Sequence, residues 1–308
     1  INLAIKGVFE NYGSPSLSQR DTLRNKTKGN HIVTVQTEHK AVLDTCRLLE
    51  KKGAEITYLK VDREGRIDLN ELKDSINEKT ILVSVMFANN ETGVIHPMKE
   101  IAAIVHEKGS ILMSDATQAV GKINVDVKQE GIDLLCMSAH KMYGPKGAGA
   151  LFIRRKNPRV SLLAQTSGGG HERGLRSGTL NVPGIAGLGK ACEIAKQEMW
   201  DDSVRLSKLR TFLEQSLLDL GDVFVNGSIR DRLSHVSNLS IHRIKADELI
   251  VKAKDISMAT GSACTSAVPE PSHVLKAMGV PDESAYSSVR FSLGKFTTKE
   301  EIDFTIKK

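Results

Sequence analysis

The sequence predicts an α/β fold with a mostly parallel sheet in a large domain, followed by a smaller α/β domain at the carboxyl end. Short apolar runs rich in β-branched residues alternate with longer helical patterns along most of the chain. Several of these runs are apolar without strict alternation, which is typical of strands covered on both faces. The helical patterns between the runs are suited to parallel crossover connections.

Six apolar runs are the candidate strands of the large sheet. A helix is expected over residues 97–108, between the third and the fourth run. In such sheets, ligands bind outside the carboxyl ends of the strands, so polar residues that follow each run are candidates for function. The predicted strands are residues 31–36, 55–61, 81–87, 110–115, 133–139 and 149–155.

The amino-terminal region of the large domain shows two further sequence patterns. Ile1, Ala4, Ile5 and Val8 have helical spacing, but no capping residue precedes them, so we expect the sequence to begin within a domain whose amino-terminal part is missing. Residues 13–30 are polar and poor in apolar side chains, which predicts a surface loop or insertion.

The pattern changes after Gly184, where long helices are predicted through about Leu220. A strand over 234–242, a helix from about Ala246 and a strand over 287–294 follow. We therefore predict a large cofactor-binding domain over 1–200 and a small domain over 201–308.

Composition excludes several classes of function. The 308 residues are 40% hydrophobic, and the net charge of +6 comes from scattered rather than blocked basic residues, so we expect no nucleic-acid partner. No apolar run approaches the length needed to span a bilayer, and we expect no membrane partner. The four cysteines have neither metal-ligand nor disulfide-framework spacing, so we expect no metal and a reducing compartment, the cytoplasm or, in a eukaryote, the mitochondrial matrix.

Lys141 is the most informative residue of the chain. It lies in the run SAHKMYGPKG at 138–147, directly after an apolar strand and among small and aromatic neighbours. We expect it to be confined and poorly solvated, a setting that suits an amine that forms an imine with an aldehyde. The aldehyde cofactor that this predicts is pyridoxal 5′-phosphate (PLP).

Three polar residues follow neighbouring strands at the same predicted sheet edge. Asp115 ends its strand and could pair with the pyridine nitrogen of PLP, although an isolated aspartate there would more often cap the next helix. Gln118 could donate to the phenolic oxygen of the ring, or could lie on a helix surface. Asn90, in the run ANNETGV, could contact the same oxygen or the substrate, but such turns are common without function.

His39 and Arg290 each have two interpretations. His39 follows the first strand and could stack on an aromatic cofactor, although a histidine at a helix start is more often a cap or a surface residue. Arg290 lies among apolar residues of the last strand, where a guanidinium suits either the carboxylate of an amino acid or a structural ion pair.

Phosphate ligands and a nucleophile complete the candidates. Ser138 and His140 flank Lys141, and the glycine-rich run at 168–179, which includes Thr179, fits neither a Walker nor a dinucleotide pattern. Cys264 lies in a segment of small residues, glycine and proline at 259–272, so we expect it to be exposed and mobile. Cys46, Cys136 and Cys192 fall within regular elements, where an inert thiol is the default.

These motifs, in this order along nearly the whole chain, resemble the cysteine desulfurases of the IscS type, which belong to the class V aminotransferase family and to the fold-type I PLP enzymes. The runs that carry the resemblance are TEHKAVLDTC, NNETGV, DATQAVGK, SAHKMYGPKG, GGGHERGLRSGT, GSACTS and SSVRFSLGKFTTKEEID.

The resemblance implies a homodimeric enzyme that converts L-cysteine to L-alanine and supplies sulfur to an iron–sulfur scaffold protein or other acceptors. Lys141 would be the Schiff-base lysine, Arg290 would bind the substrate carboxylate and Cys264 would take the sulfur as a persulfide. The cofactor would be held by Asp115, His39, Gln118, Asn90, Ser138 and His140, and Thr179 would reach the phosphate of the neighbouring subunit's cofactor.

Two alternatives follow from the same residues. Another fold-type I PLP enzyme, such as a selenocysteine lyase or an aminotransferase, would use Lys141, Asp115 and His39 equally. A non-catalytic relative that only binds assembly partners is the alternative from a different class. A need for Cys264 in sulfide release would distinguish a cysteine desulfurase from the first alternative. Binding of PLP would distinguish it from the second.

Overall fold

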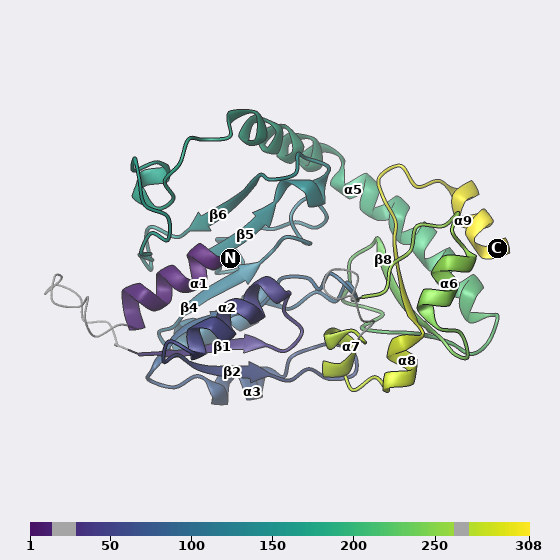
Figure 1. Cartoon of the computed structure of the whole chain (residues 1–308), viewed down its shortest axis with the longest axis horizontal. Coiled ribbons are helices and arrows are strands. Elements are labelled where there is room, and N and C mark those ends of the chain that lie inside the picture. The colour runs from purple at the N-terminus through teal and green to yellow at the C-terminus, as the bar shows by residue number, and fades with distance from the viewer. Residues whose placement is uncertain (14–28, 262–270) are drawn as a thin grey trace, which may run out of the picture.

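The computed structural model describes residues 1–13, 29–261 and 271–308. A large sheet with helices on both sides forms one part of the molecule, and a smaller sheet with its own helices lies beside it (Figure 1). The predicted loop at 13–30 falls largely outside these residues, and Cys264 falls outside them entirely.

The large sheet contains the six predicted strands, in the spatial order β2-β1-β3-β4-β5-β6. The first five are parallel and β6 is antiparallel to β5, which confirms the mostly parallel sheet. β1, β3 and β4 are buried along their whole length, which explains why their sequences do not alternate. The bounds are β1 His31–Val35, β2 Glu55–Leu59, β3 Thr80–Ser84, β4 Ile111–Asp115, β5 Leu134–Ser138 and β6 Gly149–Ile153.

Helices cover both faces of this sheet because successive strand residues point to opposite sides. Ile32 packs in one core with α1 and α2, whereas Val33 and Val35 pack in another with α3 and α4. The predicted amino-terminal helix and the helix over 97–108 are both present, the latter as α4. The bounds are α1 Asn2–Val8, α2 Lys40–Glu50, α3 Leu69–Ser75 and α4 Met98–Glu107, and a π-helical turn, η1 Phe9–Gly13, follows α1.

A single helix, α5 Val182–Leu218, occupies the region where several long helices were expected. Proline occurs only in its first turn, where it is tolerated, and Asn181 caps the helix by accepting from the backbone N–H of Gly184 at 3.1 Å. α5 runs from the large sheet towards the second part of the chain (Figure 1). The predicted domain boundary between residues 200 and 201 falls inside this helix and stays a prediction.

The second part of the chain is built on a three-stranded antiparallel sheet in the order β7-β8-β9. Its two predicted strands and its predicted helix at residue 246 are confirmed, and β7 was not predicted because it is only three residues long. The bounds are β7 Val223–Val225, β8 Val236–Ile241, β9 Ser288–Ser292, α6 Ala246–Lys252, α7 His273–Ala277, α8 Asp282–Tyr286 and α9 Lys299–Lys307.

A buried ion pair fixes α5 to this second part. The two guanidinium NH groups of Arg232 donate to the carboxylate of Glu214 at 2.7 and 2.5 Å, and both side chains are 6% exposed. Arg210, one turn earlier on α5, donates to the backbone carbonyl of Leu233 at 2.8 Å. No helix within the described ranges is both long enough and apolar enough to cross a membrane.

We predict that Glu214→Ala lowers the free energy of unfolding by about 3–5 kcal/mol, because it leaves the Arg232 guanidinium buried without its carboxylate. Urea denaturation would measure the change. The matched control is Glu193→Ala, which removes a pair with Lys190 whose side chains are more than half exposed, and which is expected to cost less than about 1 kcal/mol. Equal losses in the two variants would contradict the prediction.

Candidate active site

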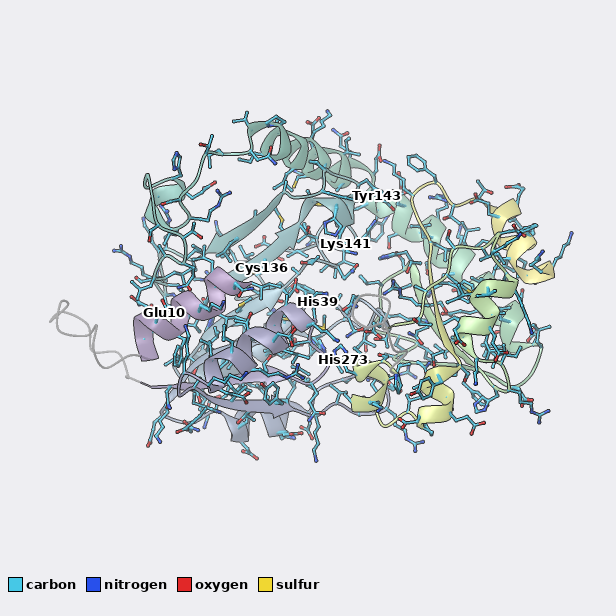
Figure 2. The ribbon with its side chains drawn as sticks, viewed as in Figure 1. Glu10, His39, Cys136, Lys141, Tyr143 and His273 are labelled. Atoms are coloured by element: carbon cyan, nitrogen blue, oxygen red, sulfur yellow. The ribbon has the colours of Figure 1, made fainter. Side chains whose placement is uncertain are left out.

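The strand order places a topological switch point between β1 and β3. From β1 the chain moves to β2 on one side, and it then returns to place β3 on the other side of β1. Crossover connections leave a crevice at such a point, outside the carboxyl ends of the strands. Figure 2 shows His39, which follows β1, and Lys141, which follows β5, on the side of the large sheet nearer to β8.

Hydrogen bonds join the segments that follow β1 and β3. The carboxylate of Glu38 accepts from the backbone N–H of Met86 at 2.5 Å, and the amide of Asn89 donates to the carbonyl of Thr37 at 3.0 Å. The backbone N–H of Phe87 donates to the carbonyl of Asp115 at 2.9 Å and so continues the connection to β4. The candidate residues therefore stand on strand ends that are fixed relative to one another.

Lys141 lies in a 3₁₀ turn, η3 Ala139–Met142, that begins where β5 ends. The expectation that it is confined and poorly solvated is wrong for this chain, because Lys141 is exposed. Residues three apart share a face in a 3₁₀ helix, and Ala139 and Met142 occupy the buried face. That arrangement turns His140 and Lys141 outward, and the Lys141 amine makes no hydrogen bond or ion pair with any described residue.

Asp115 is the carboxylate at the end of β4, and only 5% of it is exposed. One of its carboxylate oxygens accepts from the backbone N–H of Thr117 at 3.0 Å. Residues 117–119 form a turn and not a helix, so the alternative in which Asp115 caps the next helix is wrong. Within the described part of the chain, Asp115 forms no ion pair. A buried carboxylate is costly without a compensating charge, so the position suits a cationic ligand group.

His39 is the N-cap of α2, as the more conservative interpretation predicts. Its Nδ1 accepts from the backbone N–H of Ala41 at 3.1 Å, and the ring is exposed. An Nδ1 atom that accepts a hydrogen bond leaves the proton of the neutral ring on Nε2. Capping and stacking on a cofactor are compatible, because the hydrogen bond uses the ring edge and leaves its faces open.

Arg290 extends from β9 of the second sheet to the segment that follows β3. Its guanidinium donates to the backbone carbonyl of Asn90 at 2.9 Å, and its Nε is buried without a hydrogen-bond partner. No carboxylate in the described residues pairs with it within 4.0 Å, so the structural ion pair proposed as an alternative is absent from this part of the chain. The geometry brings Arg290 and Asn90 together and leaves the guanidinium with capacity for an anion.

The remaining candidates differ in their surroundings. Ser138 Oγ and His140 Nδ1 lie 2.7 Å apart beside Lys141. Gln118 is partly buried after β4 and makes no hydrogen bond to the described residues. Thr179 is exposed between the 3₁₀ turn η4 Glu172–Gly174 and α5, and no described contact joins it to the other candidates.

Two of the three cysteines in regular elements are buried, as expected. Burial raises the pKa of Cys46, on α2, to about 12, and burial also raises the pKa of Cys136, on β5. Both are free thiols, as is the partly exposed Cys192 on α5. The prediction that Cys264 is exposed and mobile falls outside the described residues.

Two buried carboxylic acids next to the candidates were not identified from the sequence. Glu38 is fully buried, and burial raises its pKa well above the ordinary value, with the charge of Asp115 adding to the effect. Glu91 is 3% exposed, and burial raises its pKa to about 7. Each directly adjoins a candidate, His39 or Asn90, and an acid a few residues after an apolar strand was the available signal.

These residues fit PLP. The buried, unpaired carboxylate of Asp115 suits a protonated pyridine nitrogen, and the free amine of Lys141 suits an aldehyde. The hydroxyl of Ser138 and the imidazole of His140 are donors that suit a phosphate.

Comparisons with known proteins agree with this geometry. Residues 17–304 match the family model for class-V aminotransferases. The chain is 50% identical over 309 residues to the cysteine desulfurase IscS of Anaeromyxobacter dehalogenans, covering 99% of this chain and 72% of the relative. It is also 50% identical over 305 residues to the cysteine desulfurase IscS of Salmonella typhi, with the same coverage.

Solved structures show the same likeness. A NifS-like protein superposes with a TM-score of 0.86 at 35% identity, covering 99% of this chain and 77% of the other. DndA from Streptomyces lividans superposes with a TM-score of 0.80 at 36% identity, covering 94% and 79%.

We predict that Glu91→Gln stabilises the protein more at pH 8 than at pH 5. The pKa of Glu91 rises on folding from its ordinary 4.5 to about 7. The native state therefore holds the proton more tightly, and the stability from this group is lost as the pH rises from 4.5 through 7. Glutamine does not ionise, so its advantage should grow by about 2 kcal/mol between pH 5 and pH 8.

Chemical denaturation of both proteins at the two pH values measures this change. Glu193→Gln, at an exposed carboxylate, is the control and should show no comparable dependence on pH. A constant difference between Glu91→Gln and the parent protein would contradict the raised pKa.

Proposed function

Since this chain belongs to the cysteine desulfurases of the class-V aminotransferase family, and is a PLP-dependent enzyme that acts on L-cysteine, we propose that its Cys264 takes the sulfur as a persulfide. The alanine product would form at the carboxyl edge of the large sheet. The assignment of this site is supported by three side chains that lack an ionic partner among the described residues: the amine of Lys141, the buried carboxylate of Asp115 and the guanidinium of Arg290.

When bound, PLP supplies an aldehyde for an amine and a ring that accepts electrons from the substrate Cα. Lys141 would hold the aldehyde carbon, and Asp115 would keep the ring nitrogen protonated. Ser138 and His140 would bind the phosphate, and Thr179 of the second subunit would add to it. His39 would cover one face of the ring, and Gln118 and Asn90 would contact its oxygen.

Lys141 is the better candidate to move the Cα proton. The Nδ1 atom of His39 already accepts from the backbone N–H of Ala41, and its other nitrogen then carries a proton. His39 therefore has no free lone pair while it caps α2. The amine of Lys141 makes no competing hydrogen bond or ion pair with a described residue, so it would be free to take the proton.

The substrate carboxylate would bind to Arg290, whose fork-shaped guanidinium matches two carboxylate oxygens. One of its NH groups already donates to the Asn90 carbonyl, which orients the side chain. Because Arg290 comes from the second sheet and Asn90 follows β3, substrate binding would depend on the packing of the two parts of the chain.

The sulfur step balances without a further reactant. The thiolate of Cys264 attacks the substrate sulfur, a sulfur–sulfur bond forms and the bond between sulfur and Cβ breaks. The electron pair of that bond passes to the substrate, which takes up protons and leaves as L-alanine. One L-cysteine and one thiol thus give one L-alanine and one persulfide.

We further propose a homodimer that passes sulfur to an iron–sulfur scaffold protein or to another acceptor in a reducing compartment. Exposed apolar side chains along α5, including Val182 at 66% and Trp200 at 76% exposure, support a partner on this helix. The free thiols of Cys46 and Cys136 support the reducing compartment.

Lys141→Ala should abolish both desulfuration and covalent attachment of the cofactor. The parent protein is expected to lose its imine absorbance on treatment with borohydride and to retain the cofactor on denaturation. The variant should retain none. The control is Lys146→Ala, an exposed lysine of the same segment, which should behave as the parent does. Covalent cofactor in Lys141→Ala would exclude this lysine as the anchor.

Cys264→Ala should bind PLP normally and lose sulfide release from L-cysteine by at least about 100-fold, because it lacks the nucleophile. Alanine and persulfide can be quantified separately, the persulfide by mass spectrometry of the peptide that carries Cys264. Cys192→Ala, which removes a partly exposed thiol on α5, is the control. Unchanged sulfide release by Cys264→Ala would favour a lyase that needs no enzyme thiol.

A further inference from the structure

One buried carboxyl group, that of Glu91, contacts residues on both sides of the segment 262–270. Ser272, which follows the segment, donates its hydroxyl to Glu91 Oε2. Gly261, which precedes it, lies so close to the same oxygen that a methyl group there would overlap it. Ser272 Oγ also caps α7, accepting from the backbone N–H groups of Val274 at 3.1 Å and Leu275 at 3.2 Å.

Glu91 is itself fixed from two directions. Its backbone N–H donates to Asn89 Oδ1 at 2.8 Å, which holds it to the turn after β3. Its carbonyl accepts from the side-chain amide of Asn238, on β8, at 3.2 Å. The preceding residue, Asn90, receives the guanidinium of Arg290. The Glu91 carboxyl is thus one residue away from the proposed substrate-carboxylate site.

The buried environment of Glu91 destabilises the ionised form of its carboxyl group. Burial raises its pKa to about 7, against the lowering effects of the Ser272 hydrogen bond, Arg290 and Lys40. An apolar side chain would avoid this cost, but it would leave the buried hydroxyl of Ser272 without its acceptor. Acids retained in such positions are concentrated at functional sites.

We propose that Glu91 is a positioning residue that fixes Gly261 and Ser272 against the Asn90–Arg290 site, and thereby sets where the Cys264 thiol meets the substrate sulfur. Cys264 follows Gly261 by three residues in the sequence. The inference rests on the proposed role of Cys264. It assigns Glu91 no contact with substrate or cofactor.

Hydrogen–deuterium exchange of the PLP-loaded protein tests the contacts without measuring activity. In Glu91→Ala, peptides that cover 256–261 and 271–278 should exchange several-fold faster, while the peptide over 205–217 of α5 should be unchanged. Glu91→Gln keeps an acceptor for Ser272 and should resemble the parent. Faster exchange on only one side, or on neither, would overturn the claim that one residue fixes both.

Single-turnover formation of the Cys264 persulfide tests the consequence. Displacing reacting groups by about 1 Å can cost up to about 100-fold in rate, so Glu91→Ala should slow the step by roughly 10- to 100-fold. Its KM for L-cysteine should stay within about twofold, because Glu91 does not bind the substrate. Glu91→Gln should restore the rate to within a few-fold of the parent.

A double-mutant cycle adds a matched test. Gly261→Ala alone should slow persulfide formation, because its methyl group meets the Glu91 carboxylate, and adding it to Glu91→Ala should cause little further loss. Fully additive losses would overturn the contact. If the parent protein forms no persulfide on Cys264, the proposed function is wrong. If it does and Glu91→Ala forms it equally fast, only the role of Glu91 is wrong.

Discussion

The parallel arrangement of β1 to β5 is the constraint on which the rest of the structure depends, because it brings the ends of five strands to one edge. Beyond that edge the backbone leaves the sheet, and its buried polar groups need new partners. Glu38 and Asn89 supply them, for Met86 N–H and the Thr37 carbonyl. The cost of burying Glu38 is therefore offset by the order it gives to the segments that carry His39 and Asn90.

Contacts from the second sheet and the segment after it also hold the candidate site in place. Arg290 crosses from β9 to the Asn90 carbonyl, and the hydroxyl of Tyr143, two residues after Lys141, accepts from the backbone N–H of Lys295 at 2.7 Å. Tyr143 adopts a left-handed conformation with φ of 63°, which ends η3 and directs the chain away from the strand. The segment of Lys141 and the side chain of Arg290 are thus both held by contacts between the two parts.

The strands and most candidate positions were predictable because both faces of the sheet are buried and each strand run ends in polar residues. The solvation of Lys141 was not, because the sequence pattern does not reveal that Ala139 and Met142 take the inward face of a 3₁₀ turn. The continuity of α5 was also missed, because its buried residues lie at 184–191 and 206–217 and the apolar spacing does not continue between them. The buried acids Glu38 and Glu91 were not predicted as site residues, because the adjacent His39 and Asn90 have side chains that more often contact a cofactor.

Glu91 shows how one turn can serve three requirements. Asn89 directs its amide back to the turn after β1, Asn90 directs its carbonyl to Arg290, and Glu91 directs its carboxyl to Ser272 and Gly261. Because the three residues are consecutive, a single turn places these three contacts next to one another. The proposed cofactor edge, the proposed substrate-carboxylate site and the residues on either side of the proposed sulfur acceptor therefore meet at one turn, and a reaction between two separately bound sulfur atoms requires such fixed positions.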